Sequence, residues 1–292
     1  MARTEAKQIA KRELSPFLKS FFSRGVIVKI SVVIAFIFVF SAIFAPLLAP
    51  HDPNQTDLIN RFAGSSLENP LGTDEFGRDN LSRLLFGARM SFISSFLSCL
   101  LGAAVGILLG LLAGYYEGAV GTIIMRYVDV QLSIPPLIFT IVISLFVGAN
   151  IPGLVFALSF GLIPVFIRMM YGLVLQLKHN DYIVAARIVG VKSGKILFMH
   201  LLPNAFPSMI VMFAMNLGGM IMLESTMSFL GIGIRIPTAS WGNMIHAAYQ
   251  HILTHPAHAI APGVSLALVV IAFNIIGDAL RDSLDPKLRG KL

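Results

Sequence analysis

The 292-residue sequence predicts an all-α protein that crosses a membrane about six times. Two observations carry this prediction. The chain is 56% hydrophobic but only 13% charged, whereas a soluble domain of this size carries about a quarter charged residues. The apolar residues also form runs of about 20 or more, the length that a roughly 30 Å hydrocarbon core requires. The mean hydropathy of +0.80 agrees with a polytopic membrane protein.

The predicted spans follow one another along the chain. They cover residues 28–49, 90–114, 121–148, 152–177, 205–230 and 260–280. The first span follows a basic arm and is long for the apolar part of a signal peptide, so we interpret it as an uncleaved anchor. The predicted organisation is an arm at 1–27, the first span at 28–49, an extracytoplasmic segment at 50–89, a core of five spans at 90–280 with a cytoplasmic loop at 178–203, and a tail at 281–292.

The basic residues predict the orientation. With the N-terminus inside, 17 of the 22 Lys and Arg residues fall on the cytoplasmic side of the spans or at their inner ends, and five fall outside. Both termini are therefore expected in the cytoplasm. The net charge of +7 lies in short loops and the arm, which indicates membrane orientation and not a nucleic-acid surface. The single cysteine, Cys99, excludes an intrachain disulfide.

The second span carries glycine at every fourth position. These residues are Gly102, Gly106, Gly110, Gly114 and Gly118. The spacing places them on one helix face, where a neighbouring helix can approach closely. We expect packing within this chain; a seam between subunits is the alternative.

The third span is interrupted by Pro135 and Pro136, which remove backbone donors and clash with the preceding turn. Freed carbonyls at this depth are tolerated only beside protein or water. Pro135 and Pro136 are therefore candidates for a hinge or for the lining of a pathway, and Pro164 in the fourth span is a further candidate.

Charged residues inside spans are the other pathway candidates. A charge at the centre of a span costs roughly 2.5–3.5 kcal/mol on insertion scales, so it normally faces a partner or an aqueous path. Arg168 in the fourth span and Glu224 in the fifth fit this description, with a structural ion pair as the equally open reading. Arg126 and Asp129 are one helical turn apart and predict a local pair.

Two sequence patterns resemble a phosphate-binding loop and a metal site, but we predict neither. Residues 190–195 resemble a phosphate-binding loop, but Val189 and Ile196 occupy the positions that require Gly and Ser or Thr. Any ATP must then be hydrolysed by another polypeptide. Four histidines (His246, His251, His255 and His258) lie between the last two spans. We expect an interfacial, partly helical loop there and predict no metal site.

The loop after the fourth span predicts a short helix, a turn and a second helix start. Ala185 and Ala186 favour helix without bulk, so a partner surface can approach them closely. Gly190 can end that helix in a left-handed conformation. Pro203, after Leu202, fits the first turn of the following helix.

These loop residues resemble the coupling motif of inner-membrane permeases of binding-protein-dependent ABC importers, in which Glu-Ala-Ala is followed by Gly and later by Leu-Pro. Ala185, Ala186, Gly190, Leu202 and Pro203 match, whereas Val184 stands at the glutamate position. Three further segments resemble the second, C-type permease of the dipeptide, oligopeptide and nickel family: PLGTDEFGRD at 70–79 with SR at 82–83 and GAR at 87–89, SFLGIG at 228–233 with Pro237 and SWG at 240–242, and FNIIGDALRDSLDP at 273–286.

The resemblance implies a type I ABC importer permease fold and a translocation subunit that is not itself an enzyme. It implies that the segment from Asp181 through Val184 to Pro203 docks on cytoplasmic ATPases, which bind the ATP and Mg²⁺; no cofactor is expected on this chain. The other implied partners are a homologous second permease and an extracytoplasmic binding protein in a bacterial or archaeal plasma membrane. The cargo would be peptides, or nickel or a metallophore. The alternative is a stand-alone secondary transporter or channel, although its usual internal repeat is not evident.

Overall fold

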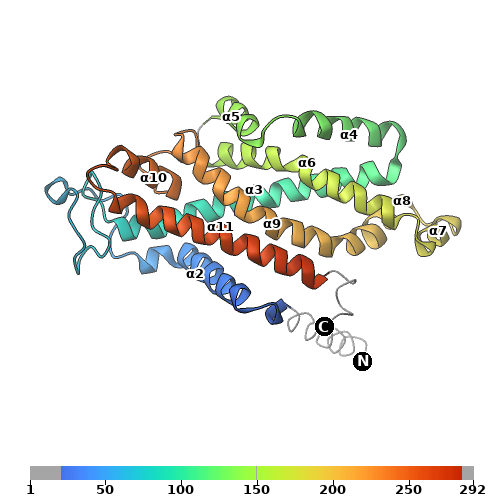
Figure 1. The fold of residues 1–292 in the computed structure, drawn as a ribbon. Helices are drawn as coiled ribbons and strands as arrows, with labels where there is room; N and C mark the ends of the chain where they lie inside the picture. Colours follow the sequence, from blue (N-terminus) through green and yellow to red (C-terminus); the bar gives the residue numbers. More distant parts are fainter. Residues whose placement is uncertain (1–20, 149, 285–292) are drawn as a thin grey trace.

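The computed structural model describes residues 21–148 and 150–284, which form a helical bundle with one isolated β-bridge between Thr73 and Asp79 (Figure 1). Five stretches are long and apolar enough to cross a membrane: α2 (Val26–Leu48), α3 (Asn80–Tyr116), α6 (Ile151–Leu177), the run from Ser193 to Phe229, and α11 (Ala257–Leu284). The pair α4 (Gly118–Leu132) and α5 (Pro136–Val147) forms a sixth span if it is counted as one. The predicted all-α class with about six spans is confirmed. The basic arm up to residue 20 and the tail from residue 285 lie outside the described residues.

The third span is broken where the sequence places two consecutive prolines. α4 ends at Leu132, α5 has Pro136 in its first turn, and the two helices meet at an angle of 99°. Proline fits the first turn of a helix because its missing N–H has no intrahelical partner there. The predicted break is therefore present, and Pro135 and Pro136 lie exposed at the bend.

α3 begins ten residues before the predicted second span, at Asn80. The Asp79 carboxylate caps it by accepting a hydrogen bond from the Ser82 backbone N–H at 2.7 Å. A hydropathy pattern misses this start because Arg83 and Arg89 lower the local average. Both are helical here, so the connection from α2 to α3 ends at Asp79 and not at residue 89.

The fifth span also begins earlier than predicted. α8 (Ser193–Lys195), the π-helical segment η2 (Ile196–Leu201) and α9 (Leu202–Phe229) form one continuous run. Pro203 therefore lies inside a continuous helical run, two residues after the π-helical segment. Proline has no N–H to donate, and the altered hydrogen-bond pattern of the π-helical segment accommodates this. The Asn204 side-chain amide donates to the His200 carbonyl oxygen at 2.6 Å and helps to satisfy this turn.

α3 packs against α6 along the glycine face. An added Cβ would lie 2.5 Å from Phe166 Cβ at Gly106 and 2.6 Å from the Ile167 carbonyl oxygen at Gly110. Gly114 is similarly crowded, by Val174 Cβ at 2.7 Å, and Gly102 less so, with the Ser159 carbonyl oxygen at 3.1 Å. The close approach is thus made within this chain. Gly118 differs: it is the first residue of α4, with φ +53° and no neighbour within 4 Å of its Cβ position.

The bundle has two distinct ends (Figure 1). One, the α7 end, carries α7 (Asp181–Ile188), the start of α2 and the end of α11, where Arg24 and Asp282 form an ion pair at 2.7 Å. The other, the cap end, carries residues 50–79, including the short η1 (Leu58–Asn60), together with α10 (Trp241–Gln250). α3 extends from one end to the other.

Candidate functional site

α7 is a short helix with a defined stop. The Gly190 N–H donates to the Arg187 carbonyl oxygen and the Val191 N–H donates to the Ala186 carbonyl oxygen, both at 3.0 Å. Gly190 has φ +81°. These are the paired bonds of a glycine-terminated helix, in which the left-handed residue favours glycine. The predicted cap at Gly190 is therefore present.

α7 presents an uncovered apolar face outside the spans. Ile183 is fully buried and anchors the helix, while Val184 is half exposed, and Ile188 and Val189 are 80% and 82% exposed. Asp181 and Ala185 are exposed as well. Val184 stands where the motif that the loop resembles has glutamate, and it makes this face more apolar. Large exposed apolar side chains outside the membrane indicate an interaction surface.

Four contacts tie residues 178–193 to the end of α3 and to Glu117 directly after it. The Arg187 guanidinium lies over the Tyr115 ring, 4.9 Å from its centroid. The Tyr115 hydroxyl donates to Ser193 Oγ at 3.2 Å. Lys178, directly after α6, donates from Nζ to the Gly114 carbonyl oxygen at 3.2 Å and forms an ion pair with Glu117. Burial and the positive charge of Arg187 lower the pKa of Lys178.

Residues 193–201, the second half of the loop after α6, continue directly into α9. Ile196, Leu197 and Leu201 of η2 are buried, and Leu202 is partly buried. Pro203 is exposed. Only residues 189–192 separate α7 from Ser193, and the helix is continuous from Ser193 to Phe229, so α7 is connected to α9 through one short turn.

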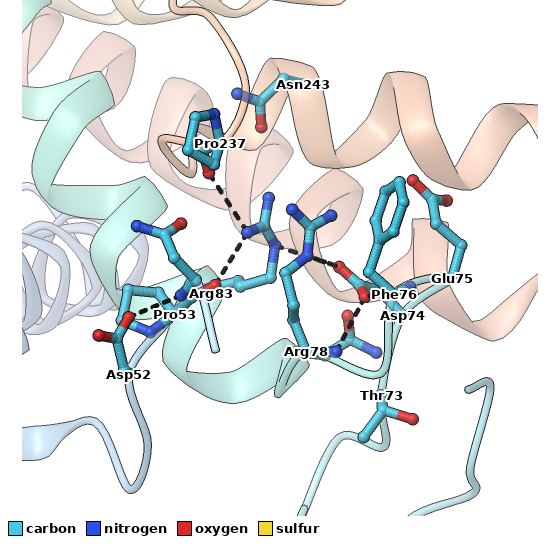
Figure 2. A network of polar contacts seen from close by, with 12 residues as sticks. Asp52, Pro53, Thr73, Asp74, Glu75, Phe76, Arg78, Arg83, Pro237 and Asn243 are labelled. Atoms are coloured by element: carbon cyan, nitrogen blue, oxygen red, sulfur yellow. Dashed lines mark hydrogen bonds and ion pairs between the residues drawn. The ribbon is translucent and has the colours of Figure 1, made fainter. Parts of the chain in front are cut away.

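A charged network fastens the first turns of α3 at the cap end (Figure 2). Asp74 Oδ2 accepts a hydrogen bond from Arg78 Nε at 2.7 Å and lies 3.4 Å from Arg83 Nε. An Arg83 guanidinium N–H donates to the Pro53 carbonyl oxygen at 2.9 Å and to that of Pro237 at 3.5 Å. Arg83 thus links α3 to Pro53, in the segment between α2 and α3, and to Pro237, in the loop after α9. In the sequence, Asp74, Arg78 and Arg83 stand out only as part of a motif; the four-residue spacing of Asp74 and Arg78 was the available signal.

The histidines lie beside this network. His255 stacks on the Phe62 ring at 4.1 Å between centroids, and His251 and His258 contact the same ring. His251 Nε2 lies 3.7 Å from a Glu75 carboxylate oxygen. Within the described ranges, no group of three or more His, Cys, Asp or Glu side chains is arranged to hold a metal ion.

The predicted pathway residues lie in three separate places. Arg168 pairs with Asp129 of α4 at 2.6 Å, and both side chains are about half exposed. Glu224 is fully buried and accepts a hydrogen bond from Ser228 Oγ at 2.8 Å. Pro135 and Pro136 lie at the α4–α5 bend. The structure does not bring these residues together.

The predicted pair of Arg126 with Asp129 is wrong, since Asp129 instead pairs across helices with Arg168. A same-helix spacing of three residues only permits such a pair. The guanidinium of Arg168 on the neighbouring α6 donates to Asp129 Oδ1 at 2.6 Å.

Comparisons with known proteins identify the family. Residues 106–290 match the model of the binding-protein-dependent transport system inner membrane component, and residues 22–70 match the N-terminal transmembrane domain of oligopeptide transport permease C. The chain is 35% identical to the dipeptide transport system permease protein DppC of Alkalihalophilus pseudofirmus over 278 residues, 94% of this chain and 91% of the relative.

A second group of relatives agrees. The chain is 39% identical to the glutathione transport system permease protein GsiD of Escherichia coli O6:K15:H31 over 250 residues, 85% of this chain and 82% of the relative. The same values hold for GsiD of Shigella boydii serotype 4. A family match over more than half of the chain, with relatives aligned along most of their length, is decisive. The chain belongs to the inner membrane components of binding-protein-dependent transport systems, as an ABC importer permease of the dipeptide, oligopeptide and nickel family with the type I fold.

Proposed function

We propose that this chain forms one half of the translocation path of a peptide importer and that ATPase subunits drive it through α7. The observation that carries the coupling role is the exposed apolar face of Val184, Ile188 and Val189. This face ends a segment held to α3 by Tyr115 and Lys178. A docking surface fastened in this way moves the spans when its partner moves.

The proposed cycle is alternating access. When the two ATPases close on ATP and Mg²⁺, which they alone bind, they displace α7. The displacement reaches α3 through Lys178 and α9 through the continuous helix from Ser193. The spans then open toward the cap end, and hydrolysis resets them. A homologous second permease supplies the other half of the path.

The proposed orientation places the α7 end in the cytoplasm. The excess of Lys and Arg on that side supports it. Residues 50–79 and the α10 region then face outward and receive the binding protein. Both chain termini lie in the cytoplasm on this proposal.

The proposed cargo is a short peptide. The named cargoes of the relatives, dipeptide and glutathione, are both peptides. Nickel is less well supported, because no cluster of metal-ligating side chains occurs among residues 21–148 and 150–284. The stand-alone transporter is disfavoured because Arg168 is satisfied by Asp129 and lies apart from Glu224.

The test is to make Ile188→Asp or Val189→Asp in the tagged chain, co-expressed with its partner subunits. We expect the ATPases to be lost from the purified complex and ATP-dependent peptide uptake to cease. The matched control is Leu253→Asp, at an exposed apolar residue of the cap end, which should retain the ATPases. If the Ile188→Asp and Val189→Asp transporters keep both the ATPases and full uptake, the coupling role is contradicted.

A further inference from the structure

A groove lined by methionine opens between three helices in the half of the bundle nearer α7. Its cavity volume is about 490 Å³, within the range of small-molecule sites. Ser208, Met212, Met215 and Asn216 line its floor. They lie four, three and one residues apart on α9 and therefore share one helix face. Met169 of α6 and Arg281 of α11 line its sides; we call this the methionine groove.

The composition of the methionine groove does not suit lipid. A hydroxyl, an amide and a guanidinium facing hydrocarbon are costly, and polar groups within spans normally face protein or an aqueous path. Ser208, Asn216 and Arg281 supply these three groups, and of these the Asn216 amide also donates to the Met212 carbonyl oxygen of its own helix at 2.8 Å. The thioether side chains of Met169, Met212 and Met215 are flexible and polarisable, so they adapt to apolar partners of different shapes.

Arg281 is the charged group of the groove. Its side chain is exposed, and no ion pair engages it among the residues that the structure describes. The neighbouring Asp282 is held by Arg24 at 2.7 Å. Asp278, one turn earlier on α11, does not line the cavity. The net charge presented to the cavity is therefore positive, which favours an anionic ligand.

We infer that the methionine groove is this subunit's wall of the aqueous path and that Arg281 attracts the carboxylate of the passing cargo. The ligand class is a short peptide with a free carboxyl terminus. The methionines accommodate varied side chains. The terminal carboxylate, which all such peptides share, interacts with the guanidinium of Arg281. This inference rests on the proposed importer function and adds the location of the path and its charge preference.

Thiol labelling of the assembled transporter in liposomes tests the groove directly. Cys99→Ala gives a chain without cysteine, into which Met212→Cys is introduced. The probes are methanethiosulfonate reagents carrying either a sulfonate or a trimethylammonium group, with rates normalised to a free thiol in solution. We expect both reagents to react, the anionic one about fivefold faster and the cationic one about fivefold more slowly than without the charge, which is the effect of one unit charge about 4 Å away in water; the preference between the two reagents is then roughly 25-fold. Arg281→Gln should abolish that preference.

Two cysteine positions calibrate accessibility. Phe36→Cys on the exposed apolar face of α2 reports a lipid-facing site, and Ile221→Cys reports the closed core. If Met212→Cys reacts as slowly as Phe36→Cys, the groove is filled by lipid and the inference is overturned. If it reacts quickly without charge preference, the role of Arg281 is overturned.

A transport measurement separates this inference from the proposed function. Uptake of a peptide with a free carboxyl terminus is compared with that of its C-terminal amide at saturating binding protein for each. Arg281→Gln should remove the preference for the free acid while ATP-driven uptake of the amide continues. Absence of any ATP-dependent uptake in the unaltered transporter would instead contradict the importer function itself. An unchanged preference in Arg281→Gln would overturn only the inference.

Discussion

Lys178 Nζ donates a hydrogen bond to the carbonyl oxygen of Gly114 at 3.2 Å, although the residues are 64 positions apart in the sequence. The lysine side chain is 3% exposed and also pairs with Glu117. The residue that ends α6 is thereby fixed to the last turn of α3. On the proposed coupling, both helices move together when α7 is displaced.

Replacing Lys178 by Met should weaken this connection. Glu117 would lose its ion pair and a buried carbonyl its donor, at a cost of about 1–3 kcal/mol. We expect ATP hydrolysis to continue while the number of peptides imported per ATP falls. The measurement is the ratio of uptake to hydrolysis in liposomes, with the exposed Lys192→Met as control. An unchanged ratio would show that the connection is not needed for coupling.

Gly106→Ala should destabilise the α3–α6 contact. Its new Cβ would lie 2.5 Å from Phe166 Cβ and 2.7 Å from the Ile163 carbonyl oxygen. Overpacking of this kind costs about 1–3 kcal/mol. Gly172→Ala on α6 is the matched control, because nothing lies within 4 Å of its Cβ position. Thermal unfolding in detergent should show a lower midpoint for the first variant only; equal midpoints would mean that the helices adjust freely.

Glu224→Gln should preserve both stability and transport. A glutamine oxygen still accepts the hydrogen bond that Ser228 Oγ donates at 2.8 Å. Glu224→Ala should lower stability by more than about 2 kcal/mol, because it leaves a cavity and a buried hydroxyl without its acceptor. Loss of uptake in a well-folded Glu224→Gln transporter would instead assign the carboxylate an ion-coupling role.

Arg83→Met should loosen the cap end. The Pro53 and Pro237 carbonyl oxygens would lose their shared donor, and Asp74 one of its two arginines. Hydrogen exchange should accelerate in residues 50–79 and 231–240, whereas exchange in α7 should not change. Arg235→Met, an exposed arginine in the same loop, serves as the control. Equal exchange in the two variants would argue that Arg83 does not brace this region.

Gly190→Ala should fray the end of α7. The residue has φ +81°, and a left-handed conformation costs an alanine roughly 1 kcal/mol or more. Amide exchange between Asp181 and Val191 should therefore rise. Gly194→Ala has no such backbone requirement and open space around its Cβ position, so it should leave exchange unchanged. Protection of α7 equal to that of the unaltered chain would exclude a capping role for Gly190.

Local signals in the sequence predicted local features well. Consecutive prolines break a helix wherever they occur, and glycine after Ala-Ala-Arg-Ile-Val is a strong helix stop, so the bend at Pro135 and the cap at Gly190 were foreseeable. The glycine spacing on α3 predicted a close helix contact, although not that α6 makes it.

Features that depend on distant partners were not foreseeable. Arg83 lowers the local hydropathy, and its partners Asp74, Pro53 and Pro237 lie outside α3. Asp129 had a candidate partner on its own helix but pairs with Arg168 of α6. The methionine groove combines residues from α6, α9 and α11. Their proximity follows from helix packing that no sequence periodicity specifies.

The 37 residues of α3 correspond to about 55 Å of unbroken helix, well beyond the roughly 30 Å hydrocarbon core. Its first turns hold Arg83 and its last holds Tyr115. One unbroken helix therefore connects the two faces, and on the proposed function the binding protein and the ATPases both act on it. By thermodynamic reciprocity, whatever a docked binding protein does to the affinity of the complex for ATP, ATP must do by the same factor to the affinity for the binding protein.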